Sequence, residues 1–181
     1  RGDEGRINHL DLVIGLFCTW ALDTRRLIAY LSEKMDISQI QGMDIPPPPA
    51  EILVIQTGDE KIEIPLDEIR RLIPHSCHIC PDMTSEWADV SVGVLEEQPD
   101  WNTLIIRTDK GKKLIEKACQ EGYLHVEKMP DDNLDHLRFA AGSKKKRAFT
   151  RARDEDVLNS TENGKRSALK VPTEVVEKII G

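Results

Sequence analysis

The stretch 88–95, ADVSVGVL, predicts a β-strand that carries small side chains on one face. Ser91 and Gly93 leave room for something to approach the backbone closely, and a bulge or tight packing would explain the pair as well. A polar loop over 96–102 separates this strand from a second apolar run at 103–108, which predicts a buried strand. The two runs indicate a sheet in the middle of the chain.

Strands and helices alternate on both sides of these two runs. The other predicted strands are 11–17, buried on both faces, the hairpin 51–57 with 61–66, and 123–127. The predicted helices are 19–35 capped by Asp23 or Thr24, 67–72, 110–121 capped by Asp109 and ended by Gly122, 131–153 and 171–180. Pro46–Pro49 predict an extended connector, and 154–170 a polar linker. We therefore expect a mixed α/β fold, with helices flanking a mixed β-sheet and a helical C-terminal segment. The expected domain is 1–150, and 151–181 is expected to be a polar linker and a terminal helix.

Composition excludes several classes of protein. The 181 residues include 39% hydrophobic residues and carry a net charge of −7, which supplies a core and argues against general nucleic-acid binding. No apolar run reaches the roughly 20 residues that span a bilayer, so we expect no membrane insertion. The first five residues lack the apolar core of a signal peptide, and we expect a cytoplasmic protein.

Cys77 and Cys80 form a Cys-x-x-Cys turn that Pro81 ends, a geometry suited to a metal or a redox couple. Cys18 ends a predicted strand just before a helix, a setting that favours a thiolate. These thiols leave three interpretations open: a structural zinc site, thioredoxin-like dithiol chemistry, and an iron–sulfur cluster. Zinc would need further ligands, for which the candidates by residue type are Cys18, His75, His78, His125 and Cys119.

Structural roles explain several other conspicuous residues. We expect Cys119 to be a buried, inert thiol beside the inward stripe of its helix, and Asp82 to cap a turn. His75 and His78 are expected to be loop residues that make ordinary hydrogen bonds. The basic cluster Lys144–Arg147, with Arg151 and Arg153, predicts a solvated helix face, and contact with an acidic partner or a cofactor phosphate is the alternative. Trp20, Trp87 and Trp101 are expected to pack in the core or the wall of a site.

An ordered set of blocks resembles a known family. The blocks are GLFC at 15–18, CHICPDMT at 77–84, ADVSVG at 88–93, WNT at 101–103, and Arg107-Thr108 with Gly111. Over roughly residues 10–150 their order and spacing are similar to the C-terminal region of the coenzyme F420 hydrogenase/dehydrogenase beta-subunit family. The resemblance implies an iron–sulfur flavoprotein that passes electrons between coenzyme F420 or a similar hydride carrier, FAD and a [4Fe–4S] cluster.

The resemblance also implies roles for individual residues. Cys18, Cys77 and Cys80 match cluster-binding positions, and the fourth ligand is open. The residues that would line the cofactor region are Thr84, Asp89, Ser91, Gly93, Trp101 and Arg107. Arg107 could pair with a phosphate or with the charge of a reduced flavin, and an exposed ion pair is the alternative.

Family members usually carry a further N-terminal region with a glycine-rich segment that helps to bind the flavin. This sequence starts at Arg1, close to the first block, so we expect FAD binding to need that region or a partner. The expected function is an electron-transfer subunit or domain of an oxidoreductase, working with other subunits of a hydrogenase, dehydrogenase or reductase complex. The alternative is a non-enzymatic docking module of a larger redox complex, stabilised by zinc or by a cluster.

Overall fold

The computed structural model describes residues 10–46, 49–58, 60–159 and 169–181. It divides into two compact units: unit 1 comprises Arg1–Thr19 and Ile79–Gly181, and unit 2 comprises Trp20–His78. Parts of the predicted connector (47–48), hairpin turn (59) and polar linker (160–168) lie outside the described residues. Mixed sheets and several helices confirm the predicted α/β class.

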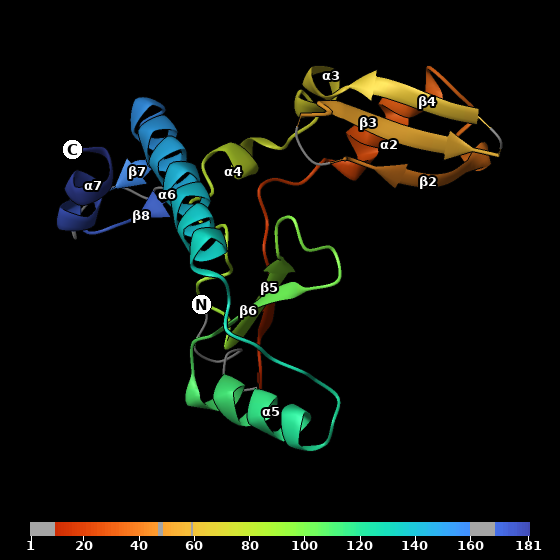
Figure 1. Cartoon of the computed structure of the whole chain (residues 1–181). Coiled ribbons are helices and arrows are strands. Elements are labelled where there is room, and N and C mark those ends of the chain that lie inside the picture. The colour runs from red at the N-terminus through yellow and green to blue at the C-terminus, as the bar shows by residue number, and fades with distance from the viewer. Residues whose placement is uncertain (1–9, 47–48, 59, 160–168) are drawn as a thin grey trace. The chain divides into compact units, whose positions relative to one another are not determined.

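Unit 2 contains an antiparallel sheet built on the predicted hairpin. Strand β3 (Ile52–Thr57) pairs with β4 (Glu60–Pro65), with Ile55 opposite Ile62. A third strand, β2 (Ile40–Asp44), pairs with the other edge of β3, as Figure 1 shows, and the sequence pattern did not predict it. Alternation along β3 buries Leu53 and Ile55 while Gln56 stays exposed, so one face of the sheet supplies the core.

Short helices complete the core of unit 2. They are α2 (Thr24–Ser32), the 3₁₀ turn η1 (Ile37–Gln39), α3 (Leu66–Arg70) and α4 (His75–His78). Asp23 caps α2 as predicted, because its carboxylate accepts hydrogen bonds from the backbone N–H groups of Arg25 and Arg26 at 3.0 and 3.2 Å. The core consists of Leu31, Leu53, Ile55, Ile64, Leu66, Ile69 and Leu72, with Trp20 packed against it.

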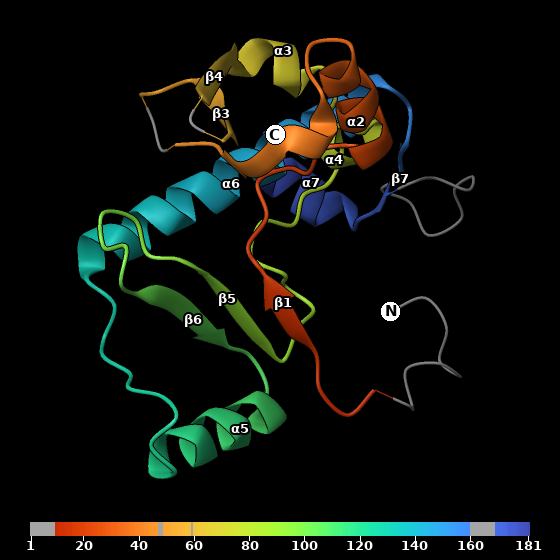
Figure 2. The same cartoon turned by 90° about the vertical axis from the view of Figure 1, so that its right-hand side faces the viewer.

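Unit 1 contains a three-stranded mixed sheet in the order β1-β5-β6 (Figure 2). Strand β1 (Ile14–Leu16) runs parallel to β5 (Val90–Val94), and β6 (Asn102–Ile106) runs antiparallel to β5. The prediction that the first strand is buried on both faces was wrong. Leu16 is 71% exposed, because β1 is an edge strand with neither of its apolar side chains covered.

Helix α5 (Asp109–Gln120) packs against the start of β5. Its cap is Thr108 rather than the predicted Asp109, because the Thr108 hydroxyl accepts a hydrogen bond from the Gly111 N–H at 3.2 Å. Gly122 ends the helix at a φ of 78°, as predicted. The strand predicted at 123–127 does not form, and these residues are exposed and paired with no strand.

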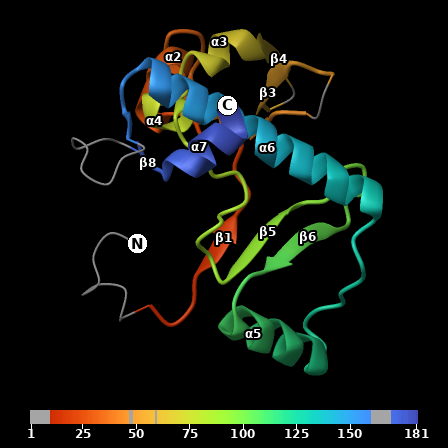
Figure 3. The same ribbon diagram turned by 90° about the vertical axis from the view of Figure 1, so that its left-hand side faces the viewer.

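The predicted long helix is α6 (Asp131–Asp154). Figure 3 shows α7 (Thr173–Ile180), the predicted terminal helix, beside it. Between them β7 (Leu158–Asn159) and β8 (Leu169–Lys170) form a short parallel pair. In the described part of the chain, no helix combines the length and the apolar character needed to cross a membrane.

Candidate functional site

Two of the three predicted cluster ligands belong to unit 1. Cys18 lies two residues beyond the end of β1, and its backbone N–H donates to the Met83 carbonyl at 2.8 Å. The Cys80 thiol donates to the Asp82 carbonyl, with 3.7 Å between sulfur and oxygen. Cys77 lies on α4, which belongs to unit 2, so the boundary between the units falls inside the Cys-x-x-Cys turn. All four cysteines are free thiols.

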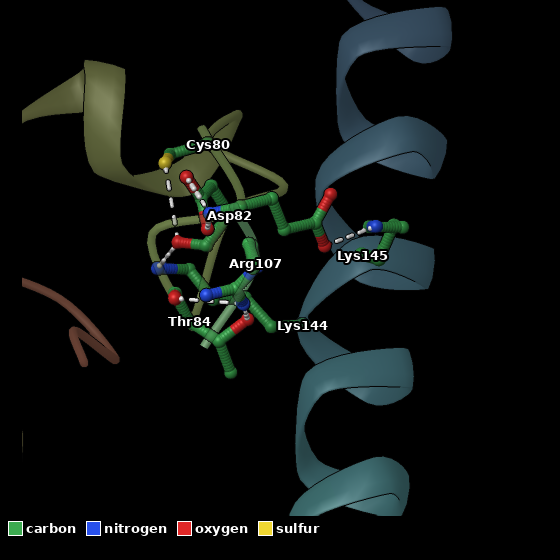
Figure 4. Close-up of polar contacts among 7 residues, drawn as sticks. Cys80, Asp82, Thr84, Arg107, Lys144 and Lys145 are labelled. Carbon is green, nitrogen blue, oxygen red and sulfur yellow. Dashed lines mark hydrogen bonds and ion pairs between the residues drawn. The ribbon is translucent and has the colours of Figure 1, made fainter. Parts of the chain in front are cut away.

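Lys144 joins the segments that carry Cys18 and Cys80. Its ammonium donates to the Cys18 carbonyl at 2.6 Å and to the Asp82 carbonyl at 2.8 Å. Figure 4 shows the side chain reaching from α6 toward the turn that contains Asp82. Only 5% of Lys144 is exposed, so the predicted solvated helix face is wrong for this residue, whereas Lys146 and Arg147 are exposed as expected. The Asp82 carbonyl thus accepts from both the Cys80 thiol and the Lys144 ammonium.

The position of Lys144 on α6 explains its burial. The buried residues of this helix are Lys144, Ala148, Phe149 and Ala152, and steps of four residues connect the lysine with the two alanines. A lysine in such a stripe packs its methylene groups against the apolar core, and its ammonium group extends past the edge of that core. The spacing could have identified Lys144 from the sequence, but its residue type and three basic neighbours indicated an exposed position.

Thr84, Ser91 and Arg107, all predicted to lie in the cofactor region, form one hydrogen-bonded group. The Arg107 guanidinium donates to the Ser91 hydroxyl at 2.5 Å. It also donates to the hydroxyl and carbonyl of Thr84 at 2.9 and 3.1 Å, next to which it lies in Figure 4. Ser91 is fully buried and in turn donates to the Ser85 carbonyl at 3.2 Å. These contacts tie the loop that follows the cysteine turn to the central strand β5.

Asp89 directly precedes β5 and anchors the start of this strand. Its carboxylate accepts from the Val13 N–H at 2.8 Å and from the Thr108 hydroxyl at 2.6 Å, which links the residue before β1 to the cap of α5. The side chain of Asp82 likewise accepts from the Glu86 N–H at 3.1 Å, which confirms the predicted turn cap. Both carboxylates therefore hold backbone segments in place.

A hollow of about 440 Å³ opens beside Cys18 within unit 1. Its wall includes Phe17 and Gly93 from the sheet and Leu137 from α6. A side chain at position 93 would collide with the Phe17 ring, since a Cβ there would lie 1.9 Å from it. The lining is mostly apolar, and the full set is Leu16, Phe17, Cys18, Thr19, Met83, Val92, Gly93, Val94, Leu95, Glu96, Asn102, Thr103, Met129, Asn133, Leu137 and Ala140.

The remaining predicted residues lie elsewhere. Trp101 is half-buried, with its ring centroid 5.9 Å from that of His125, and it does not line the hollow. Cys119 is a half-buried residue of α5. His75 and His78 lie on the short helix α4 rather than in a loop. Among the residues that the structure describes, no three His, Cys, Asp or Glu side chains gather into a group that could hold a metal ion.

Residues 4–132 match a family model that describes the C terminus of the beta subunit of coenzyme F420 hydrogenase/dehydrogenase. An uncharacterised protein of Methanocaldococcus jannaschii is 31% identical over 130 residues, which are 67% of this chain and 50% of that protein. The coenzyme F420 hydrogenase subunit beta of Methanothermobacter thermautotrophicus is 27% identical over 145 residues, 78% of this chain and 50% of that protein. The chain spans about half the length of these curated relatives.

A solved structure also resembles this chain. It belongs to the F420-reducing [NiFe] hydrogenase complex from Methanosarcina barkeri, and the match has a TM-score of 0.67 at 22% sequence identity. The match covers 87% of this chain and 53% of the hydrogenase chain. At this level of identity the similarity establishes the fold.

Proposed function

Because the chain belongs to the coenzyme F420 hydrogenase/dehydrogenase beta-subunit family, we propose that it is an electron-transfer subunit or domain of an F420-linked oxidoreductase. Its partners are other subunits of a hydrogenase, dehydrogenase or reductase complex, since relatives include hydrogenase beta subunits and a coenzyme F420-dependent sulfite reductase. In this proposal Cys18, Cys77 and Cys80 are ligands of a [4Fe–4S] cluster, and a fourth ligand comes from outside this set.

The observation that carries the proposal is the bridge that Lys144 makes between two thiol-bearing segments. Cys18 and Cys80 are far apart in the sequence, yet one buried ammonium donates to the carbonyls of Cys18 and Asp82. The donor set suits iron–sulfur ligation, because soft thiolates bind such clusters and hydrogen bonds and nearby charges tune them. A cation beside the thiols also fits the net negative charge of a cluster bound by thiolates.

The cluster would supply single-electron transfer, and the residues of this chain would bind and position it. The contacts of Arg107 with Thr84 and Ser91 fix the loop after the cysteine turn to strand β5. Asp89 in turn fixes the start of β5 through its hydrogen bond from the Val13 N–H. Thr84, Asp89 and Ser91 are each at least nine-tenths buried, so water does not loosen this support. Rigid support of this kind is what a redox site needs to keep its ligands in place.

We also propose that the hollow beside Cys18 receives the apolar ring of a flavin or deazaflavin. Its volume, about 440 Å³, lies within the range of cofactor pockets, and Gly93 lets the wall stay close to the Phe17 ring. In this proposal Thr84, Ser91 and Arg107 support the wall of the hollow from behind and do not line it. Trp101 also lies outside the lining. In this proposal, FAD binding also needs an N-terminal region or a partner.

Metal and sulfide analysis of anaerobically purified, reconstituted protein tests the proposed function. Iron and sulfide in comparable amounts, with a broad absorption band near roughly 400 nm, are expected for a [4Fe–4S] cluster. Zinc without such a band would instead support the metal-stabilised docking module and overturn the redox proposal.

Serine variants then test the ligand assignment. Cys77→Ser should lose most of the iron, whereas Cys119→Ser should keep it, because Cys77 lies in the Cys-x-x-Cys turn and Cys119 is a half-buried residue of helix α5. Iron analysis of the two variants side by side makes the comparison. An equal loss from both would show that Cys119 is a ligand rather than a structural thiol.

A further inference from the structure

Lys144 is a buried cation whose hydrogen-bond partners carry no charge. Its two acceptors, the carbonyls of Cys18 and Asp82, are neutral groups. Within the described part of the chain, no carboxylate forms an ion pair with it, whereas the neighbouring Lys145 pairs with Glu86 at 2.5 Å. Burying an ammonium without an anion is costly, and such groups are normally paired. The burial of Lys144 therefore favours a negatively charged group close to its ammonium, near the Cys18 and Asp82 carbonyls.

This region carries thiols. Lys144 donates to the backbone of Cys18 itself and shares the Asp82 carbonyl with the Cys80 thiol. The Asp82 carboxylate already accepts from the Glu86 N–H, so the candidates for a further negative charge are the sulfur atoms of Cys18 and Cys80, as thiolates bound to a metal cluster. Lys144 also lies beyond the 4–132 region that matches the family model, so the match itself assigns it no role.

We propose that Lys144 is a positioning residue of the redox site, which holds the Cys18 and Cys80 segments together and offsets the negative charge of the cluster. The inference rests on the proposed function, because it needs a cluster on these thiols. Adding one electron at the site adds one negative charge near the ammonium. The cation should therefore favour the reduced form and raise the reduction potential.

Two substitutions separate the hydrogen bonds from the charge. Lys144→Met removes both, while Lys144→Gln removes the charge and keeps an N–H donor on a side chain that is one atom shorter. Lys146→Met is the matched control, because Lys146 lies on the same helix and is exposed. All variants are reconstituted anaerobically and compared by iron content, by circular dichroism, and by a redox titration with dithionite as the reductant.

We expect Lys146→Met to match the wild-type protein in iron content and midpoint potential. Lys144→Gln should bind iron, with the ratio of reduced to oxidised cluster at a given potential lowered about tenfold, which is a shift of about 59 mV for a one-electron couple. Lys144→Met should bind at most half as much iron as the control. If Lys144→Met fails to fold, the potential of Lys144→Gln decides, and loss of iron from a folded Lys144→Gln also supports the role of the charge.

Two results would overturn the inference, and they differ in what they say about the proposed function. A wild-type protein that takes up no iron and sulfide refutes both. A wild-type protein with a cluster, combined with a Lys144→Gln variant that matches Lys146→Met in iron content and potential, refutes the role of Lys144 and leaves the proposed function standing. A lysine with only a structural role would change the thermal stability of the protein without changing the midpoint potential of the cluster. The redox titration therefore distinguishes that role from the proposed one.

Discussion

Replacing Gly111 with alanine should destabilise unit 1, although alanine normally favours helices. A Cβ at position 111 would lie 2.4 Å from the Asp89 carbonyl oxygen and 2.7 Å from a methyl group of Val90. Ordinary contact begins near 3.4 Å, so α5 would have to move away from β5 by about 1 Å. The Asp89 carbonyl cannot easily yield, because it accepts a hydrogen bond from the Arg107 N–H at 2.9 Å.

The magnitude follows from two opposing effects. Overpacking costs about 1–3 kcal/mol, and a clash with backbone belongs at the upper end of that range, while replacing glycine by alanine in a helix gains about 1 kcal/mol. The net loss in the free energy of unfolding should therefore be about 2 kcal/mol, a fall in Tm of about 4–8 °C for a protein of this size. Gly142→Ala in α6 is the control, since a Cβ there meets nothing within 4 Å and should stabilise by up to about 1 kcal/mol.

Urea unfolding followed by circular dichroism measures both variants against the wild-type protein. The two units can unfold in separate transitions, so the change should appear in only one of them. If Gly111→Ala proves as stable as Gly142→Ala, the close packing of α5 against β5 is wrong.

Two further substitutions probe the polar contacts. Asp89→Asn should lower the free energy of unfolding by about 2 kcal/mol in urea titrations, because an amide cannot accept from both Val13 and Thr108 and turns a donor toward one of them; an unchanged midpoint would contradict this role. Tyr30→Phe should make unit 2 less sensitive to acid, as measured by Tm between pH 6 and pH 3. The Tyr30 hydrogen bond is the main cause that lowers the pKa of Glu68 below its ordinary 4.5, so its contribution is complete above that pH and is lost as the pH falls through the lowered pKa. Equal acid sensitivity of the two proteins would rule out this contribution.

Local patterns predicted the elements whose structure depends on local chemistry. The hairpin of β3 and β4 followed from an apolar first arm, a turn at Gly58, which has a φ of 57°, and a polar and apolar alternation in the second arm. Asp23 was predicted as a cap because a carboxylate before a helical stripe satisfies free backbone N–H groups. In both cases neighbouring residues in the sequence determine the outcome.

Features that depend on distant partners were missed. Strand β2 is short and mostly exposed, and it exists because β3 offers an edge for pairing. The apolar run at β1 predicted burial, but a sequence does not show which side chains other segments cover. The burial of Lys144 was missed because its basic neighbours outweighed its four-residue spacing to Ala148, and its partners Cys18 and Asp82 are distant in the chain. The family resemblance assigned roles to the three cysteines and none to the lysine that binds the Cys18 and Asp82 carbonyls.

The family match ends before the helix that carries Lys144 is complete. The match stops at residue 132, whereas α6 begins at Asp131 and continues to Asp154. An expression fragment cut at the matched boundary would keep Cys18, Cys77 and Cys80 and discard the helix that donates to the backbone beside two of them. Fragment design in this protein should therefore follow α6 to its end.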